Sequence, residues 1–399
     1  MKQVLSRCLL VAATHLLCPA ALPADEDKPL IPKTLNEQLV TITVGTGWSR
    51  IDLETTLFVP PGAGPFPLVV INHGKTAGDP RFEPRARYLA ASHEFLRRGY
   101  LVAIPMRPGF AKSAGSPVDP GCNIESNGRV QAETIIDFLR EMRTRPDVDA
   151  DRILVIGQSH GGLTAMAIGA IGFPGLRGIL NFAGGLRYTA QGCLWEQALV
   201  DAFAAYGRSS QVPSLWFYGD NDSYWGKQLP GEMYRAFAAA GGQAELVSYG
   251  TFAGGDAHLM FDSPQGVAIW WPESERFLRQ VGLPTEVRFA ILLTPRPART
   301  EYADVQDVEA VPYLDDHRRE LYANFLTLPR PRAFAIAVTG NVGWAHSGPD
   351  SPASALENCA RVAKRPCSLY AVDDEVVWPV DKPARQSGAG GWQAPATEP

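Results

Sequence analysis

The chain has 399 residues, of which 45% are hydrophobic, and a formal net charge of -5 at pH 7. This length is enough for one large domain and a smaller one. The negative charge argues against nucleic acid as the main partner. The sequence has no C-x-x-C pair or histidine cluster that would indicate a metal site, and we expect neither a metal nor a cofactor.

Residues 1–24 are predicted to be a signal peptide. Two basic residues precede an apolar stretch from Cys8 to Leu22, and small residues come before Asp25. His15 and Pro19 interrupt this stretch, which is too short for a stable membrane span, although an uncleaved anchor is the alternative. We therefore expect an exported protein, periplasmic or secreted, with no stable membrane span.

Residues 25–284 are predicted to form an α/β domain. An antiparallel strand pair comes first, and then buried β-branched runs alternate with amphipathic ones, which is typical of a doubly wound, mostly parallel sheet. The predicted strands span 39–44, 52–59, 68–72, 101–105, 152–156, 176–182, 214–218 and 244–249, and the predicted helices span 88–98, 127–143, 231–240 and 267–281. In such sheets the chemistry lies at the carboxyl ends of the strands.

The alternation stops at Leu283-Pro284-Thr285, so residues 285–380 are predicted to be a small α+β C-terminal module. We expect strands at 287–293, 333–338 and, as a pair, within 369–378, and helices at 313–326 and 352–363. From about residue 381 Pro, Gly, Gln and Ala dominate without apolar periodicity. We therefore predict that residues 381–399 form a disordered tail.

The only G-x-S-x-G match in the chain is Gly157 to Gly161, with Ser159 at its centre. It stands between the strand-like run 152–156 and a helix-compatible run, where a sharp turn would expose the serine hydroxyl. Glycines two positions on either side avoid clashes in such a turn. We predict that Ser159 is a nucleophile, and the alternative is a plain glycine-rich turn.

A serine nucleophile needs a base and an acid that orients the base. Asp220 and Asp222 follow the strand 214–218, and we prefer Asp222 because a few loop residues must turn the carboxylate towards a histidine, with Asp220 as second choice. His258 is the predicted base, since it lies in a Gly-rich loop after the last strand of the domain. His317 reads as part of a solvated helix, and His346 belongs to the C-terminal module.

Two backbone N–H groups are predicted to stabilise the oxyanion that acyl transfer creates. One belongs to His160, directly after the nucleophile, and the other to Lys75, in the loop after the strand 68–72. We assign only the backbone of His160 a role, because its side chain reads as a pocket wall or a structural hydrogen-bonding group.

Removal of the signal peptide leaves four cysteines, and an even number in an exported chain suggests two disulfides. Three pairings are open. Cys359 and Cys367 are close in sequence, and Cys122 and Cys193 lie in loops of the larger domain, so we favour these two local pairs. The alternative is four buried, unpaired thiols.

The elbow, the His73-Gly74 turn, Gly219-x-x-Asp222 and the His258 loop follow one another in an order that resembles the α/β-hydrolase superfamily. Arg98-Gly99-Tyr100-Leu101-Val102, followed by Pro105 to Phe110, is similar to the dienelactone hydrolase-like branch. True dienelactone hydrolases use a cysteine nucleophile, whereas this elbow carries Ser159. The resemblance therefore implies ordinary ester hydrolysis.

The C-terminal module resembles small cysteine-paired modules appended to exported bacterial proteins. It reads as a structural appendage, or else as a part that binds a cell-envelope partner. For the whole chain we expect an exported serine hydrolase that cleaves small-molecule carboxylic esters through Ser159, His258 and Asp222. The alternatives are a serine peptidase with the same triad and a catalytically silent binding protein.

Overall fold

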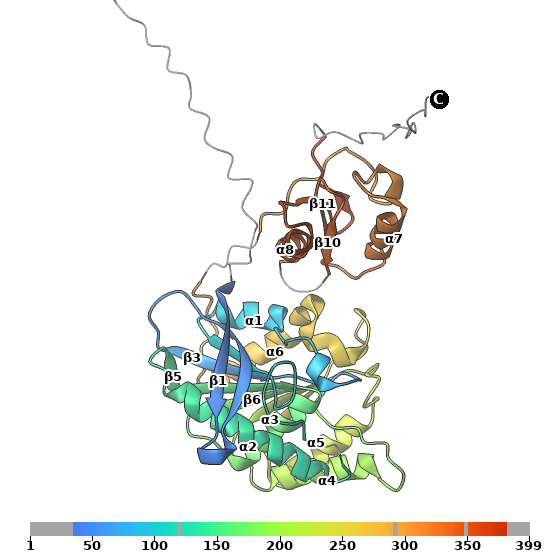
Figure 1. Ribbon diagram of the computed structural model, residues 1–399. Coiled ribbons are helices and arrows are strands. Elements are labelled where there is room, and N and C mark those ends of the chain that lie inside the picture. Colours follow the sequence, from blue (N-terminus) through green and yellow to red (C-terminus); the bar gives the residue numbers. More distant parts are fainter. Residues whose placement is uncertain (1–34, 119–120, 290–293, 347–349, 381–399) are drawn as a thin grey trace, which may run out of the picture.

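The computed structural model describes residues 35–118, 121–289, 294–346 and 350–380. The predicted signal peptide and the predicted disordered tail lie outside the described residues. Within the described ranges, no helix is long and apolar enough to cross a membrane. Figure 1 shows a large α/β region followed by a smaller one, which carries the orange and red end of the chain.

The large region is built on an eight-stranded sheet with the strand order β1-β2-β4-β3-β5-β6-β7-β8. Its strands are β1 (Glu37–Val44), β2 (Ile51–Phe58), β3 (Phe66–Asn72), β4 (Leu101–Pro105), β5 (Val148–Gln158), β6 (Leu176–Phe182), β7 (Ser214–Tyr218) and β8 (Ala244–Ser248). β2 is antiparallel to β1 and β4, and every pair from β4 to β8 is parallel. The predicted doubly wound, mostly parallel sheet is confirmed.

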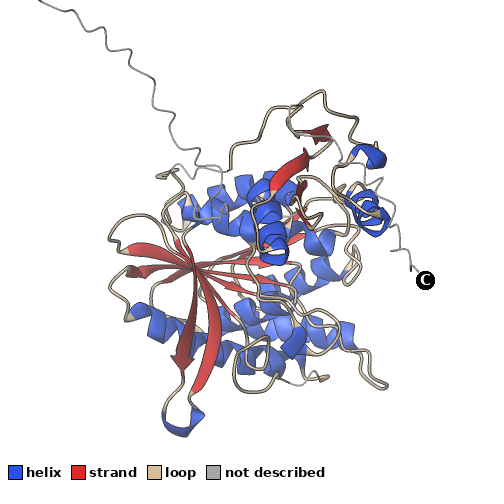
Figure 2. Cartoon of the chain, turned by 45° about the horizontal axis from the view of Figure 1, so that its top comes forward, coloured by secondary structure: helices blue, strands red, loops and turns tan. Residues whose placement is uncertain are grey.

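Helices cover both faces of this twisted sheet (Figure 2). They are α1 (Leu89–Leu96), α2 (Ile124–Arg143), α3 (His160–Ile171), α4 (Trp195–Gly207), α5 (Leu229–Ala239) and α6 (Val267–Gln280). Side chains alternate between the faces of a strand, so Leu68 and Val70 of β3 belong to the core with α2 to α5, while Val69 and Ile71 belong to the core with α1 and α6. This burial on both faces explains the continuous apolar runs of the strands.

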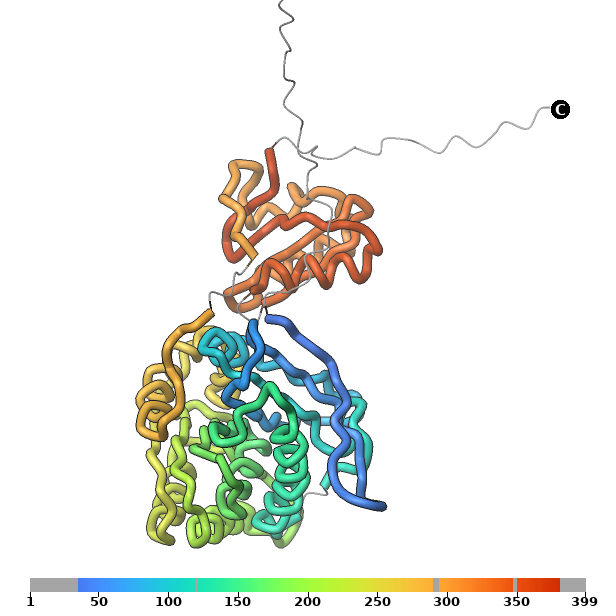
Figure 3. The backbone as a smooth tube through the Cα atoms, turned by 90° about the vertical axis from the view of Figure 1, so that its left-hand side faces the viewer, coloured from blue at the N-terminus to red at the C-terminus, as the bar shows by residue number. Residues whose placement is uncertain are grey.

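The C-terminal module has a four-stranded sheet of its own. In Figure 3 this module is the separate orange and red part of the tube. Its elements are α7 (Asp316–Phe325), β9 (Ala333–Ile336), β10 (Val342–Ala345), α8 (Ser351–Ala363), β11 (Ser368–Val372) and β12 (Glu375–Val376). Phe334 and Ile336 of β9 pack in the core with α7, and Ala333 and Ala335 pack in the core with α8. The predicted α+β character of the module is confirmed.

The structure differs from the sequence prediction at three elements. Helix α4 was not predicted, although its residues Leu199, Phe203 and Tyr206 are buried at helical spacing. Strand β10 was not predicted. The expected strand at 287–293 is wrong for residues 287–289, which have no regular structure, and its remainder lies outside the described residues.

Both cysteine pairs lie at disulfide distance. Cys122 joins Cys193 across 71 residues, and Cys359 joins Cys367 across eight. The first pair connects the segment before α2 with the segment before α4, and the second closes the end of α8 onto the start of β11.

Candidate active site

Ser159 lies in the turn between β5 and α3, with backbone angles of φ 55° and ψ -124°. A residue other than glycine rarely adopts a positive φ, and such strained backbone positions cluster at functional sites. The glycines around it are required by close backbone contacts. A Cβ atom on Gly157 would lie 2.1 Å from the carbonyl oxygen of Gly161, and a Cβ on Gly161 would lie 2.0 Å from that of Asn72. The turn therefore has the geometry that the G-x-S-x-G pattern predicts.

His258 faces Ser159 from the short 3-10 helix η5 (Ala257–Asp262), which follows β8. Its Nε2 atom lies 2.9 Å from Oγ of Ser159, and its Nδ1 atom lies 3.1 Å from both carboxylate oxygens of Asp222. An ionised carboxylate only accepts hydrogen bonds, so Nδ1 carries the proton and Nε2 keeps a free lone pair. This is the tautomer in which Nε2 can accept the hydroxyl proton of Ser159.

Asp222, and not Asp220, is the carboxylate that contacts His258. It is buried after β7, and its Oδ1 atom accepts hydrogen bonds from the backbone N–H groups of Tyr224 at 2.9 Å and Trp225 at 3.2 Å. Asp220 instead pairs with Lys227 at 2.8 Å on the surface side of the loop. The two backbone donors hold Asp222 in place and satisfy the lone pairs that His258 does not use.

The other histidines within the described residues do not reach the serine hydroxyl. His317 and His346 belong to the C-terminal module, and His93 lies on α1 next to Glu94. His73 is buried under the loop after β3, where its Nδ1 atom lies 2.7 Å from the carbonyl oxygen of Gly74 and its Nε2 accepts from the backbone N–H of Arg107 at 2.9 Å. Burial, followed by the charge of Arg107, holds the pKa of His73 well below its usual value.

The side chain of His160 is a structural group, as the sequence suggested. Its Nδ1 atom accepts from the guanidinium of Arg107 at 2.9 Å, so Nε2 carries the proton and donates to Oδ1 of Asn127 at 2.8 Å. Burial first, and then the charge of Arg107, lowers the pKa of His160 well below its usual value. The ring is therefore neutral at neutral pH.

The two residues whose backbone N–H groups are predicted to bind the oxyanion lie close to Ser159. His160 is the first residue of α3, so its N–H has no carbonyl one turn earlier in the helix to bind. Lys75 follows Gly74, on which a Cβ atom would lie only 3.2 Å from Cβ of Ser159. Lys75 and Ser159 line the same two hollows, so the loop after β3 passes close to the nucleophile.

Two hollows meet at Ser159. The larger, about 650 Å³, extends under the segment 83–89 and towards Asp256 and Asp262. The smaller, about 320 Å³, extends along the segment 185–190, and Trp225 also lines it. Tyr224 lines both of them, and its ring stacks on the imidazole of His258 with 4.2 Å between ring centroids. An ester carbonyl bound at Ser159 would thus have room for one substituent on each side.

Three polar residues of this site were not predicted from the sequence, namely Gln158, Tyr88 and Arg107. Gln158 donates from Nε2 to the backbone carbonyl of His258 at 2.9 Å, and its Oε1 accepts from the hydroxyl of Tyr88 at 3.3 Å. Gln158 therefore connects the loop of the base with the segment around α1. Arg107, directly after β4, contacts both His160 and the carbonyl of Gly74, at 2.9 and 2.6 Å. Only tertiary packing brings these groups together, and no local pattern indicates it.

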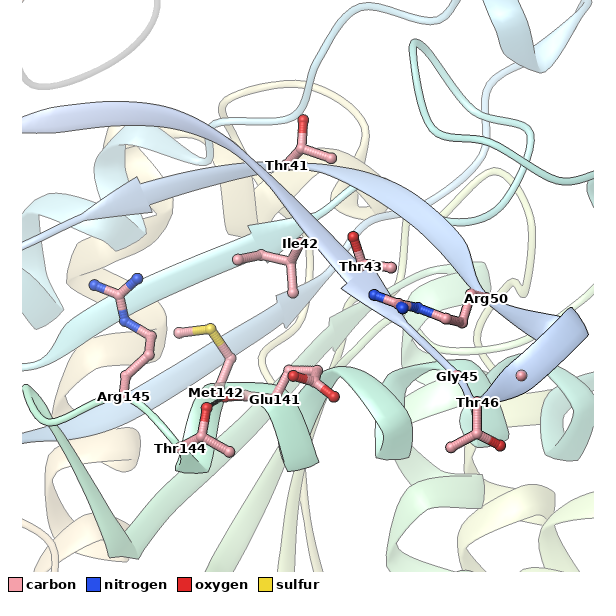
Figure 4. A pocket seen from close by; sticks show the side chains of 11 residues that line it. Thr41, Ile42, Thr43, Gly45, Thr46, Arg50, Glu141, Met142, Thr144 and Arg145 are labelled. Atoms are coloured by element: carbon pink, nitrogen blue, oxygen red, sulfur yellow. Dashed lines mark hydrogen bonds between the residues drawn. The ribbon is translucent and has the colours of Figure 1, made fainter.

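A third hollow, about 510 Å³, lies between β1 and the C-terminal end of α2 (Figure 4). Ile42 and Met142 point into it, and Arg50 and Arg145 lie at its two ends. No serine, cysteine or histidine lines it, and none of the predicted site residues does. Among the described residues, no group of three or more His, Cys, Asp or Glu side chains lies close enough together to hold a metal ion.

Residues 48–240 match the family model described as X-Pro dipeptidyl-peptidase (S15 family). A search of curated proteins found no match. Among solved structures, a Klebsiella pneumoniae protein assigned to the dienelactone hydrolases is 16% identical and the alignment covers 62% of this chain and 98% of that one, with a TM-score of 0.41.

Two further solved structures come from an esterase and a peptidase. For an esterase of Pyrococcus furiosus the identity is 17%, the coverage 63% of this chain and 93% of that one, and the TM-score 0.45. Dipeptidyl peptidase 4 of Porphyromonas gingivalis is 15% identical, and the alignment covers 61% of this chain and 35% of that one, with a TM-score of 0.46.

Proposed function

We propose that this chain, an α/β-hydrolase, is an exported serine hydrolase that cleaves carboxylic esters. The observation that carries the proposal is the unbroken series of hydrogen bonds from Ser159 through His258 to Asp222, at 2.9 and 3.1 Å, beside two hollows. Serine activation by a histidine that a buried carboxylate orients is the arrangement that acyl transfer requires.

In the first half of the reaction, Oγ of Ser159 attacks the ester carbonyl while its proton passes to Nε2 of His258. The carbonyl oxygen becomes an oxyanion, which accepts hydrogen bonds from the backbone N–H groups of His160 and Lys75. As the tetrahedral intermediate collapses, the ester C–O bond breaks and the imidazolium gives its proton to the leaving alcohol. The acyl group remains on Ser159.

In the second half, His258 removes a proton from a water molecule, and the resulting hydroxide attacks the acyl-enzyme carbonyl. The bond to Oγ then breaks, Ser159 takes its proton back from His258, and the carboxylic acid leaves. Throughout both steps Asp222 keeps the imidazole oriented and stabilises its positive charge. No metal or cofactor is needed in this sequence of steps.

A serine peptidase is the second candidate, and one observation favours it: residues 48–240 match a family model of X-Pro dipeptidyl-peptidases. The triad serves both reactions equally, so the difference lies in the leaving group, which is an alcohol in one case and an amine in the other. Export is part of the proposal because two cysteine pairs at disulfide distance suit an oxidising compartment.

The proposal is tested by labelling with a fluorophosphonate and by hydrolysis of a matched ester and amide, such as the p-nitrophenyl ester and p-nitroanilide of one acyl group. We expect labelling and ester turnover in the natural chain and neither in Ser159→Ala, which keeps the fold because alanine is small. Ser126→Ala, on the exposed face of α2, is the matched control. Turnover retained by Ser159→Ala would contradict the proposal, and faster turnover of amides or X-Pro peptides would favour the peptidase.

A further inference from the structure

Arg107 is a buried arginine whose hydrogen-bond partners are neutral. It is 2% exposed, and its guanidinium donates to the carbonyl oxygen of Gly74 at 2.6 Å, to Nδ1 of His160 at 2.9 Å and to Oε1 of Gln131. The ring of Phe110 covers it at 4.5 Å. Among the described residues, the ion pairs do not include one with Arg107, and the carboxylate of Glu83 acts on it only through space.

A buried charge without an ion-pair partner is costly, so its presence calls for a reason. Burial lowers the pKa of Arg107 to about 10, and the side chain therefore remains charged at neutral pH. Arg98 offers the contrast within the same region. It is also buried, but it pairs with the carboxylate of Glu94 and stacks on Trp271 at 3.5 Å. Structural burial of an arginine in this fold thus comes with a counter-ion.

The charge of Arg107 acts on the peptide bond between Gly74 and Lys75. The carbonyl oxygen of that bond accepts from Arg107 and also from Nδ1–H of His73, at 2.7 Å. In a trans peptide the C=O and N–H groups point in opposite directions. Because the carbonyl is held towards the buried guanidinium, the N–H of Lys75 is turned away from it, towards the side of the loop that lines the hollows with Ser159.

The neighbouring peptide is fixed as well. The N–H of Gly74 donates to the hydroxyl of Tyr88 at 3.2 Å, and the same hydroxyl contacts Gln158 beside the nucleophile. A cation bound to an amide oxygen also polarises the amide, which makes its N–H a stronger donor. The guanidinium in addition holds the ring of His160, whose backbone N–H is the other predicted donor.

We infer that Arg107 is the positioning residue of the oxyanion hole. It holds the Gly74–Lys75 peptide and the start of α3 in one arrangement, so that the N–H groups of Lys75 and His160 converge on the oxygen of a substrate bound at Ser159. Its buried charge also favours the negative charge that develops there. This inference rests on the proposed function, because it concerns the oxyanion of the acyl transfer that Ser159 performs.

The test compares Arg107→Gln and Arg107→Lys with Arg98→Gln, a matched change of another buried arginine. For each variant one measures kcat and KM for p-nitrophenyl acetate, the Kd of phenylboronic acid, which forms a tetrahedral adduct with an activated serine, and the melting temperature. For Arg107→Gln we expect a kcat lower by about 100-fold, a boronate Kd raised by a similar factor and a KM within about threefold. Arg98→Gln should melt at a lower temperature with unchanged kcat and boronate affinity.

Arg107→Lys keeps the charge but replaces the fork of donors by one ammonium group, so it should recover part of kcat and of boronate affinity. If Arg107→Gln does not fold, Arg107→Lys alone tests the inference. We then expect kcat and boronate affinity each to be about tenfold lower than in the natural chain. Wild-type kcat in a folded Arg107 variant would overturn the inference, as would a fall in kcat without any loss of boronate affinity.

The outcome separates this inference from the proposed function. If the natural chain cleaves no ester, the proposed function is wrong, whereas boronate binding at Ser159 still compares the natural chain with the Arg107 variants. Equal boronate Kd values would then overturn the role of Arg107. Ester turnover in the natural chain together with unchanged Arg107 variants would overturn the role of Arg107 and leave the proposed function intact.

Discussion

Each of the two sheets has a buried arginine next to a strand, and the two arginines are bonded in different ways. Arg332, directly before β9, donates to the carboxylate of Asp374 at 2.8 Å and to carbonyl oxygens at and just after the end of α7, among them Phe325 at 3.2 Å and Leu328 at 2.8 Å. A cation at the C-terminal end of a helix satisfies its free carbonyls and its dipole. Arg332 is therefore a structural residue, whereas Arg107 holds its charge among neutral groups beside the nucleophile.

The comparison teaches that burial of a charge does not by itself mark a functional site. What separates the two arginines is whether a carboxylate forms an ion pair with them. Arg332 has such a pair in the C-terminal module, and its charge serves the fold. Among the described residues Arg107 has none, since Glu83 acts on it only through space, and its charge is held against Gly74 and His160, next to Lys75 and Ser159. The following changes test this distinction, from the largest expected effect to the smallest.

Asp222→Asn should lower kcat by about 10⁴-fold, because the imidazole of His258 loses the carboxylate that fixes its tautomer. Asp220→Asn removes only the surface contact with Lys227 and should leave kcat nearly unchanged. The kcat values of both variants, measured by steady-state kinetics on one ester, test this difference. Equal losses would mean that the contact of Asp222 with His258 is not what activates the serine.

Arg332→Gln should destabilise the C-terminal module by about 2 to 3 kcal/mol, because carbonyl groups at the end of α7 lose their donor. Ester hydrolysis should not change, since Arg332 lies in the other region of the chain. Thermal unfolding followed together with activity measures both effects. A loss of kcat in a folded Arg332→Gln protein would break the comparison between the two arginines.

The stability of the large region should fall as the pH drops below about 6.5. His73 and His160 have lowered pKa values in the folded chain, so below that pH the unfolded state binds protons that the folded state does not. Between pH 6.5 and about pH 5.5, the free energy of unfolding should fall by about 1 kcal/mol less in His160→Gln than in the natural chain. Urea unfolding at the two pH values gives this difference.

Ser126→Ala provides the control for that experiment, because it changes no ionisable group and should leave the pH dependence as it is in the natural chain. If His160→Gln shows the same pH dependence as the natural chain, the imidazole of His160 takes up a proton in the folded state, and its proposed neutral, structural role is wrong.

Removal of the C-terminal module should have the smallest effect. Residues 284–289 contact the large region through Tyr100 to the carbonyl of Pro284, through Arg98 to that of Thr285, and through the N–H of Phe289 to the carbonyl of Arg97. A chain ending after Phe289 keeps these contacts and should retain kcat for small soluble esters within about threefold, because no triad residue lies beyond it. A truncated chain that melts cooperatively yet cleaves no ester would show that the module shapes the site.

The buried strands were predictable from the sequence because their apolar runs are flanked by turn residues. The bounds of β4, β6 and β7 agree with those predicted. Helix α4 was missed although its apolar residues have helical spacing, and no side-chain N-cap marks its start at Leu194. Strand β10 is short and half-buried, so its four residues carry little periodic signal.

The candidate triad was predictable because motif order and strand ends restrict the choice of residues, and the structure places Ser159, His258 and Asp222 in contact. The network around it was not. Gln158 and His258 are 100 residues apart in the chain, and Gly74 and Arg107 are 33 apart. Such contacts depend on how the loops pack at the edge of the sheet, and neither composition nor spacing expresses them.

The two hollows beside Ser159 have a consequence for the order of events. Ser159 and Tyr224 line both of them, so under the proposed function the acyl part and the alcohol part of an ester can occupy different spaces. The alcohol can then depart while the acyl group stays on the serine, and its hollow is free for the next molecule. Water would not be the only acceptor: a short alcohol added in excess would enter the same space and compete for the acyl group, and the protein would act as a transesterification catalyst with ping-pong kinetics.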